Sequence, residues 1–421
     1  MKLSIFVSRF VYIVLFVANV VLLPKKEICP SGAFPEHEHI KPGKVVAGYF
    51  LGWTIDLNGY KPHKVDPIAE KLTHLMYSFY KPLEDGTGSF MKPELEFDIN
   101  ENTESGKAGG NFAELVQLKK DHPHLKLMIA VGGGSFNKVF MRLQKKGLLK
   151  KYARSCVDAL DQYEHVIESN GKKATLTYQG LFDGIDVDWE LSPSKISKKV
   201  AQDYLMFVKE LRRLLDQRAE RIGQPTVLTA ALQLGRSVYR KLPLKEVARY
   251  IDWYHVMGYD VNTFGSGEVG YNAPICGNRK HFTIDGALNG IMREGVLPSQ
   301  LVLVVPFYGR QYDEADEVGD SFDRASKDTR TMPFYKIDAI LEKQSKDIVV
   351  GDDSKRLSSF LIDKKKDSFL VYDDAQDIGF KARYAAENRC RGVGAWALSY
   401  DDKEHELVHA LSDYVGKKMF E

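Results

Sequence analysis

Residues 182–190, FDGIDVDWE, alternate acidic and apolar side chains with the two-residue period of a β-strand. Successive side chains of a strand point to opposite faces, and residues two apart lie roughly 7 Å apart on one face. Asp186, Asp188 and Glu190 therefore project together, and the residues between them point the other way. If helices cover the apolar face, the acids face an enclosed interior. The stretch thus predicts a strand of a closed sheet with carboxylates inside.

Seven further short apolar runs lie on either side of this stretch, at the spacing of repeated β-α units. Amphipathic stretches separate them, such as residues 201–220, whose Leu and Phe residues recur at helical spacing. Eight parallel strands with intervening helices predict an α/β fold, a (β/α)8 TIM barrel with its active site at the C-terminal ends of the strands. The predicted strands are KVVAGYF (44–50), LTHLMYSFY (72–80), LKLMIAV (125–131), FDGIDVDWE (182–190), TVLTAALQL (226–234), RYIDWYHVMGY (249–259), LVLVVPFYG (301–309) and RGVGAWAL (391–398).

One interval is too long for a loop. About 60 residues separate Tyr308 from the helix expected near Asp374, and they contain short segments of their own at 334–344 and 368–372. We therefore expect a small α+β insertion at about 311–371, after the seventh strand. The barrel with this insertion is expected to occupy residues 44–421.

Three carboxylates on one inner face are costly, because burial and like-charge repulsion both oppose ionisation. A metal site or a satisfied polar network would be the plainer explanation. However, an acid with a raised pKa is what protonation of a glycosidic oxygen requires. Because these acids lie in a row on one strand, they suit a substrate-assisted mechanism rather than two carboxylates on opposite sides of a sugar. In that mechanism the N-acetyl group of the sugar attacks its own anomeric carbon.

The segment DGIDVDWE resembles the DxxDxDxE signature of glycoside hydrolase family 18, the chitinase family. The resemblance implies that Glu190 is the general acid and that Asp188 orients and stabilises the acetamido group. It also implies that Asp186 shares a proton with Asp188, and that Asp183 supports the network structurally. The similarity spans roughly residues 44–412.

Residues 254–260, YHVMGYD, resemble the MxYD motif of the same family. The resemblance implies that Met257 forms a pocket wall, that Tyr259 bonds the acetamido oxygen, and that Asp260 contacts substrate. A further set of expected substrate-binding residues comes from the first, seventh and eighth strands, which resemble the family in AGYFLGW, PFYGR and GAWAL: Tyr49, Trp53, Arg310 and Trp396. Trp396 is expected to form the aromatic floor beneath the scissile sugar, since apolar sugar faces stack on such rings.

Ala130 departs from the family pattern, in which the third strand usually ends SxGG. The missing hydroxyl removes one donor from the carboxylate network, and we expect a change in the pKa of Asp183 or Asp186. The resemblance implies a chitinase that cleaves β-1,4 links between N-acetylglucosamine units with retention. A chitin-binding lectin, an endo-β-N-acetylglucosaminidase and a metal-dependent carbohydrate enzyme are the alternatives. We expect no cofactor, and a monomer.

The charge balance gives no sign of a nucleic-acid partner, with 59 basic and 57 acidic residues and a net charge of +2. The four cysteines, Cys29, Cys156, Cys276 and Cys390, are scattered and show no zinc-ligand spacing, so we expect no metal. Disulfides and isolated buried thiols both remain open for them.

The N-terminal 23 residues contain an apolar run, residues 10–23, that follows Lys2 and Arg9. Fourteen residues are short for a bilayer span and typical of a signal peptide, which predicts a secreted protein. An uncleaved membrane anchor is the alternative, since no small-x-small cleavage site follows, and a buried core helix ranks third. Residues 24–43 are expected to form an irregular leader.

Overall fold

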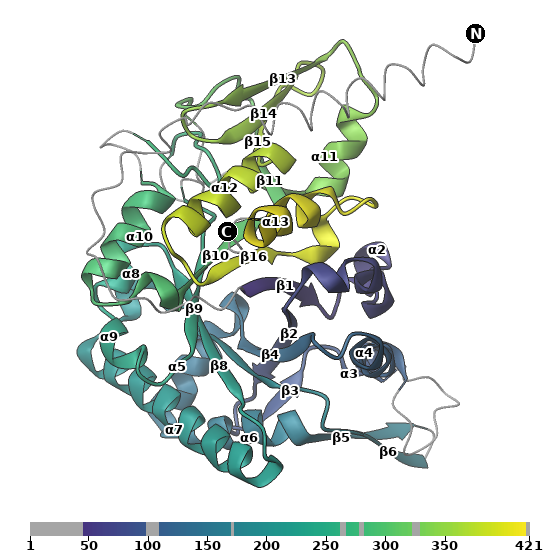
Figure 1. Ribbon diagram of the computed structural model, residues 1–421, viewed down its shortest axis with the longest axis vertical. Helices are drawn as coiled ribbons and strands as arrows, with labels where there is room; N and C mark the ends of the chain where they lie inside the picture. Colours follow the sequence, from purple (N-terminus) through teal and green to yellow (C-terminus); the bar gives the residue numbers. More distant parts are fainter. Residues whose placement is uncertain are drawn as a thin grey trace. The chain divides into compact units, whose positions relative to one another are not determined.

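The computed structural model describes residues 45–97, 109–169, 172–261, 267–277, 282–321 and 329–417. In this part of the chain, eight parallel strands pair in sequence order, and the first pairs with both the second and the last, which closes a barrel (Figure 1). All eight predicted strands and the (β/α)8 TIM-barrel fold are confirmed. The barrel strands are β1 (Val45–Leu51), β2 (His74–Pro82), β4 (Lys126–Gly132), β7 (Gly184–Asp188), β8 (Val227–Gln233), β9 (Trp253–Met257), β10 (Leu301–Pro306) and β16 (Gly392–Trp396).

The expected signal peptide or anchor at 1–23 and the leader at 24–43 lie outside the described residues, as does Cys29. No helix in the described ranges is both long and apolar enough to cross a bilayer. Cys156 and Cys390 are free thiols in the core, whereas Cys276 is disulfide-bonded.

Helices lie between the strands and cover the barrel. The longest, α7 (Lys198–Ile222), contains the helix predicted at 201–220 and buries Tyr204, Leu211 and Leu215 along one face. It begins where the side chain of Ser197 accepts a hydrogen bond from the amide of Val200, which satisfies one of the unpaired N–H groups of its first turn. The other helices are α2 (Ile55–Asn58), η1 (Pro62–Lys71), α3 (Pro93–Glu96), α4 (Gly110–Asp121), η2 (Gly134–Phe136), α5 (Asn137–Lys146), α6 (Leu149–Asp161), η3 (Pro193–Lys195), α8 (Arg236–Tyr239), α9 (Leu244–Val247), α10 (Ile284–Arg293), η4 (Pro298–Gln300), α11 (Phe334–Leu341), α12 (Ala375–Glu387), η5 (Leu398–Tyr400) and α13 (Glu406–Lys417).

The interior of the barrel is filled by side chains from alternate positions of its strands. Met76, Met128 and Trp253 belong to one buried apolar cluster, which also includes Ala130. In the strand register, Ala130 of β4 lies beside Asp186 of β7, and Asp186 lies beside Thr229 of β8. An acid is thus set between Ala130 and Thr229, beside a large apolar cluster of the interior.

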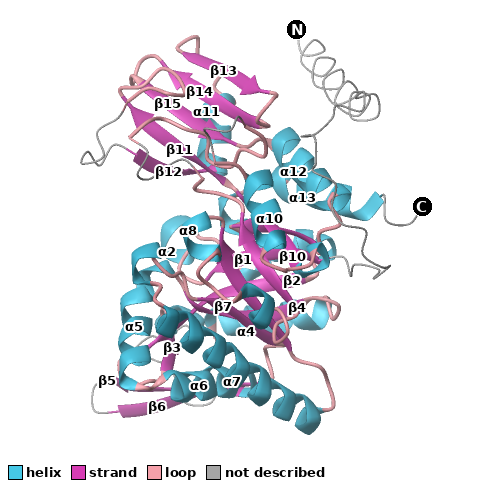
Figure 2. Ribbon diagram, turned by 90° about the vertical axis from the view of Figure 1, so that its left-hand side faces the viewer, coloured by secondary structure: helices cyan, strands magenta, loops and turns pink. Residues whose placement is uncertain are grey.

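A second sheet follows β10 after a single residue, Phe307. It contains five antiparallel strands in the order β12-β11-β15-β14-β13 and is visible as a separate group of arrows in Figure 2. Tyr312, Phe369 and Val371 form part of its own small core. Its strands are β11 (Tyr308–Asp313), β12 (Thr329–Pro333), β13 (Ile348–Asp353), β14 (Ser358–Asp363) and β15 (Ser368–Tyr372), with α11 between β12 and β13.

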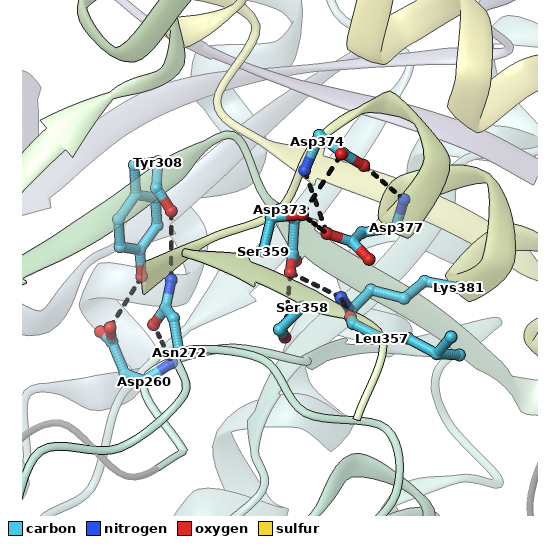
Figure 3. A network of polar contacts seen from close by, with 10 residues as sticks. All are labelled: Asp260, Asn272, Tyr308, Leu357, Ser358, Ser359, Asp373, Asp374, Asp377 and Lys381. Atoms are coloured by element: carbon cyan, nitrogen blue, oxygen red, sulfur yellow. Dashed lines mark hydrogen bonds and ion pairs between the residues drawn. The ribbon is translucent and has the colours of Figure 1, made fainter. Parts of the chain in front are cut away.

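A buried polar cluster joins this sheet to α12 (Figure 3). The Lys381 ammonium lies 2.7 Å from Asp373 Oδ1 and donates to the carbonyl of Leu357, also at 2.7 Å. Asp374 and Asp377 form a reciprocal capping box at the start of α12. The side chains of Lys381 and Asp373 are fully buried, so the return of the chain from the inserted sheet to the barrel depends on a charge pair rather than on apolar packing alone.

An antiparallel hairpin, β5 (Gln162–Ser169) and β6 (Lys172–Gln179), separates α6 from β7 and was not predicted. A sequence signal for it exists: Asn170-Gly171 stands between two runs rich in β-forming residues, which is a strong hairpin pattern. A further short strand, β3 (Gly88–Phe90), pairs antiparallel with the end of β2.

Candidate active site

A cavity of about 240 Å³ opens at the C-terminal ends of the barrel strands. Asp188, Met257 and Trp396 are the last residues of β7, β9 and β16, so the strands themselves bring these side chains to the cavity. Enzymes of this architecture place their chemistry at this end of the barrel. The lining residues are Asp188, Glu190, Met257, Tyr259, Asp260, Tyr308, Arg310, Thr331, Trp396 and Tyr400.

Asp186 lies beneath the cavity, fully buried, with hydrogen-bond donors on both carboxylate oxygens. The Tyr49 hydroxyl donates to Oδ2 at 2.7 Å and the Thr229 hydroxyl donates to Oδ1 at 2.6 Å. His255 Nδ1 lies 3.3 Å from Oδ1. Burial opposes ionisation, but the contacts from His255, Thr229 and Tyr49 hold the pKa of Asp186 below its usual value. Asp186 is therefore the ionised member of the row.

His255 is also fully buried, and its partners fix its tautomer. Its Nε2 lies 2.9 Å from the indole Nε1 of Trp253, which can only donate. Nε2 must therefore accept, which places the hydrogen of a neutral ring on Nδ1. Nδ1 lies 3.0 Å from the Tyr49 hydroxyl, so a chain of donors runs from Trp253 through His255 and Tyr49 to Asp186.

Asp188, two residues further along β7, has the opposite electrostatics. Burial, followed by the nearby carboxylates of Glu190 and Asp186, raises its pKa well above the ordinary value. Its Oδ1 is buried and has no hydrogen-bond partner among the described residues. Since Asp188 lines the cavity, this oxygen is placed to accept a hydrogen bond from a ligand.

Glu190 lies just beyond the end of β7 and reaches the same cavity. Burial and the charge of Asp260 raise its pKa, whereas a hydrogen bond from the backbone amide of Gly134 opposes the rise. The triple glycine leaves room for this arrangement. A Cβ on Gly134 would lie 2.7 Å from Glu190 Oε1, and one on Gly132, which has φ of +115°, would lie 2.4 Å from the carbonyl oxygen of Asp188.

Tyr259 and Met257 form one wall of the cavity. Burial, together with Tyr308 and the carboxylates of Asp188 and Glu190, raises the pKa of Tyr259 well above its usual value. The hydroxyl therefore remains protonated near neutral pH and can donate a hydrogen bond into the cavity. The ring is held edge-on against Tyr308, with 6.0 Å between the centroids.

Asp260 and Arg310 meet at the junction of the barrel and the inserted sheet. Asp260 Oδ1 accepts from the Tyr308 hydroxyl at 2.8 Å and from Arg310 Nε at 3.0 Å. The backbone amide of Asp260 donates to Asn272 Oδ1 at 3.0 Å, and the side-chain amide of Asn272 donates to the carbonyl of Tyr308 (Figure 3). Both predicted substrate-binding residues therefore line the cavity while paired with each other.

A row of aromatic rings runs along the ends of β1, β2 and β16. Trp396 lies 5.2 Å from Tyr49 and 5.9 Å from Phe79, centroid to centroid, and Phe79 stacks on Trp53 at 5.8 Å. Of the three predicted aromatic binding residues, Trp396 lines this cavity, whereas Tyr49 and Trp53 do not. Tyr49 is 3% exposed and faces Asp186 instead.

Asp183 lies before the first residue of β7, at the opposite end of that strand from the cavity. Its Oδ2 accepts from Lys119 Nζ at 2.8 Å and from the amide of Leu127 at 2.9 Å. Asp183 therefore stabilises the start of the β4–β7 pairing, and none of its described hydrogen bonds reaches Asp186 or Asp188.

The family model described as glycosyl hydrolases family 18 matches residues 45–401. The chain belongs to this family. Chitinase A1 of Niallia circulans is 24% identical over 413 residues, which cover 85% of this chain and only 56% of that protein. Endochitinase 1 of Metarhizium anisopliae is 26% identical over 390 residues, 89% of this chain and 86% of that protein. The catalytic domain of psychrophilic chitinase B from Arthrobacter TAD20 shares the fold, with 22% identity and a TM-score of 0.76 over 89% of this chain and 96% of that one.

In this family 18 chain, Ala130 is buried between Ser78 of β2 and Asp186 of β7 in the strand register. The Ser78 hydroxyl is buried and has no hydrogen-bond partner in the described part of the chain. Asp186 already receives hydrogen bonds from Tyr49 and Thr229. The hydroxyl missing at position 130 therefore does not leave this carboxylate without donors.

Several site residues of the family 18 chain were not anticipated from the sequence. His255 could have been found, because it lies two residues before Met257 on the same strand and so shares its inward face. Thr229 could have been predicted in a similar way, since β8 follows β7 in the barrel. Thr331 and Tyr400 also line the cavity. They lie outside the motifs, so no comparable sequence pattern pointed to them.

Proposed function

We propose that this family 18 chain is a chitinase that hydrolyses β-1,4-glycosidic bonds between N-acetylglucosamine units with retention of configuration. The proposal rests on two residues that line one cavity. The pKa of Glu190 is raised, and the buried Oδ1 of Asp188 has no hydrogen-bond donor among the described residues. The first group keeps its proton to a higher pH than an ordinary glutamic acid does, which suits transfer of that proton to a leaving oxygen. The second can accept the N–H of an acetamido group.

The reaction begins with transfer of the Glu190 proton to the glycosidic oxygen. As that C–O bond breaks, the acetamido oxygen of the same sugar attacks the anomeric carbon and forms a cyclic cation. Asp188 accepts the acetamido N–H and stabilises the positive charge, and Tyr259 donates to the acetamido oxygen. The Glu190 carboxylate then takes a proton from water, whose oxygen attacks the anomeric carbon from the side that the leaving group vacated. Two inversions give net retention.

The surrounding side chains would position the sugar and the reacting groups. Trp396 offers an apolar ring for a sugar face, and Met257 lines the same cavity. Asp260 and Arg310 offer polar contacts at the inserted sheet. Asp186 acts through Asp188, because its negative charge keeps the neighbouring proton in place, and Tyr49 acts through Asp186. Contact of sugars with Trp53, further along the aromatic row, remains a prediction.

Glu190→Gln tests the acid role. Loss of a general acid removes on the order of 10²–10⁴-fold in rate, so kcat for a fluorogenic di- or tri-N-acetylchitooligosaccharide should fall by that factor while thermal unfolding is unchanged. The matched control is Glu220→Gln on the exposed side of α7, which should retain full activity.

Other outcomes separate the alternatives. Binding of the oligomer without cleavage by the parent protein would contradict the proposal and favour the chitin-binding lectin. Preferential cleavage of N-glycan cores would favour the endo-β-N-acetylglucosaminidase. Loss of activity in a chelator would favour a metal-dependent reaction.

We also propose that the protein enters the secretory route. Cys276 is disulfide-bonded, and disulfides persist in oxidising compartments. The apolar run at 10–23 supplies the targeting segment. Secretion with cleavage and retention by an anchor both follow this route, and sequencing the N-terminus of the mature protein distinguishes them.

A further inference from the structure

Two histidines and a glutamate meet on the side of the barrel opposite the cavity. His122 and His124 lie in the connection from α4 to β4, and Glu70 lies near the end of η1, just before β2. Both connections lead into the N-terminal ends of strands. The cluster is therefore separated from the catalytic carboxylates by the length of the barrel.

The three side chains converge closely enough to share one cation. Each offers one ligand atom, and these atoms lie within 4.8 Å of one another. His122 Nδ1 lies 2.9 Å from Glu70 Oε1, and His124 Nδ1 lies 3.8 Å from the same oxygen. Tetrahedral zinc with bonds of about 2.0–2.1 Å separates neighbouring ligand atoms by about 3.3 Å. The two distances lie on either side of that value, and Glu70, whose side chain is 74% exposed, is free to adjust.

The far side of each imidazole is held as in a built metal site. His124 Nε2 lies 3.1 Å from the carbonyl oxygen of Ala69, which can only accept. A neutral His124 ring therefore carries its hydrogen on Nε2 and leaves the Nδ1 lone pair free, 3.8 Å from Glu70 Oε1. His122 Nε2 lies 2.9 Å from Asp66 Oδ1. Metal-binding histidines commonly donate their second N–H to a backbone carbonyl or a carboxylate in this manner.

A simpler explanation covers only part of this arrangement. A protonated His122 between Asp66 and Glu70 would account for two contacts as ion pairs. To cover the contact of His124 Nδ1 with the same glutamate oxygen, His124 would have to be protonated as well, which places two imidazolium rings beside one carboxylate oxygen. A cation bound by the three ligand atoms satisfies both rings, and its binding would release the proton from His122 Nδ1.

We propose that Glu70, His122 and His124 bind a divalent first-row transition cation of the zinc type, with water completing the coordination. Imidazole nitrogen with one carboxylate suits such ions rather than calcium or magnesium. The cation ties η1 to the connection before β4 and stabilises the N-terminal side of the barrel. The sequence alone predicted no metal, because Glu70 precedes His122 by 52 residues and no motif joins them.

Zinc titration of the full chain, purified through a chelator and then freed of it, tests the proposal by calorimetry. One zinc site is expected, and His124→Gln and Glu70→Gln should each weaken it at least about tenfold. His63→Gln is the matched control, since His63 forms a similar surface pair with Glu114 at 2.9 Å but belongs to no three-ligand group among the described residues. This control should bind zinc as the parent does.

Thermal unfolding gives a second, independent readout. Zinc at 100 times its dissociation constant should raise the Tm of the parent by about 3 °C, and that of Glu70→Gln by no more than about half as much. Hydrolytic activity should be the same with and without zinc, because the site lies away from the cavity. Absence of binding up to about 1 mM zinc, or equal binding by the two variants and the parent, overturns the proposal.

Discussion

Two aspartates on one strand, Asp186 and Asp188, acquire opposite acid strengths from their immediate contacts. Both are buried, but Asp186 receives hydrogen bonds from Tyr49 and Thr229, whereas one oxygen of Asp188 has no partner among the described residues. The pKa of the first falls and that of the second rises. The negative charge of Asp186 thus helps to keep a proton on Asp188.

Tyr49→Phe should test this division. Removing the hydroxyl that lies 2.7 Å from Asp186 makes its ionised form less favourable, so its pKa rises and the proton on Asp188 is held less tightly. We expect kcat to fall about tenfold, with the acidic limb of the pH–rate profile displaced and KM nearly unchanged. Steady-state kinetics from pH 4 to 9 measure kcat, KM and the position of the acidic limb. A uniform loss of rate with an unshifted profile would mean that Tyr49 serves only packing.

The residues that carry the proposed chemistry could be chosen from the sequence because they lie on one strand. Period-two alternation places Asp186, Asp188 and Glu190 on one face before any fold is known. The role of Tyr49 could not be read in this way. Its distance from Asp186 depends on closure of the barrel, which brings together residues 137 positions apart.

At the scale of elements, the junction between β15 and α12 depends on buried charge. Lys381 has two acceptors, Asp373 and the Leu357 carbonyl, and the side chains of Lys381 and Asp373 are fully buried. Burial raises the pKa of Asp373 although Lys381 opposes the rise. A buried pair of this kind adds little over apolar packing, but loss of one partner leaves an uncompensated charge.

Lys381→Met should therefore lower the free energy of unfolding by about 3–5 kcal/mol. Lys343→Met, at an exposed position after α11, is the control and should change it by less than about 0.5 kcal/mol. Urea unfolding of both variants gives the comparison. If Asp373→Asn is then combined with Lys381→Met, part of the loss should return, because the unpaired carboxylate is gone. An unaffected Lys381→Met protein would show that the pair does not stabilise this junction.

The regular part of the architecture followed from the sequence, and the irregular part did not. Buried parallel strands are mostly continuous apolar runs, and seven of the eight were found from that property, whereas β7 was found from its alternation of acidic and apolar residues. The β5–β6 hairpin escaped because its strands alternate with polar and charged residues, such as Glu164 and Lys173, and look like surface helix or loop. Only the turn pair Asn170-Gly171 distinguished it.

Across the whole molecule, several carboxyl groups outside the active site are buried without a full set of charge partners. Burial raises the pKa of Glu96 to about 8, despite a hydrogen bond from the Tyr77 hydroxyl at 3.0 Å. The pKa of Asp401 is also raised to about 8 by burial, against hydrogen bonds from the amides of Leu407 and Val408. Asp377, in the capping box of α12, reaches about 8 as well, through burial and the charge of Asp374.

These groups predict that the fold loses stability as pH rises. A carboxyl whose pKa is higher in the folded than in the unfolded chain stabilises the fold fully below about pH 4, and its contribution is lost as pH rises toward 8. Carboxylates with lowered pKa, such as Asp353 and Asp363, titrate below this window and do not offset the trend. The free energy of unfolding should therefore decrease between pH 5 and pH 8, by up to about 1.4 kcal/mol per pH unit for each such group.

Glu96→Gln isolates one contribution. The amide oxygen still accepts from Tyr77, and the substitution removes the charge that must otherwise form in the interior. We expect the variant to match the parent at pH 5, to be more stable at pH 8, and to show a shallower dependence between them. Urea unfolding at each pH measures the two slopes, with Glu94→Gln, an exposed neighbour on α3, as control. Equal slopes in Glu96→Gln and the parent would mean that Glu96 ionises in the folded protein as easily as in the unfolded one, against the burial of its side chain.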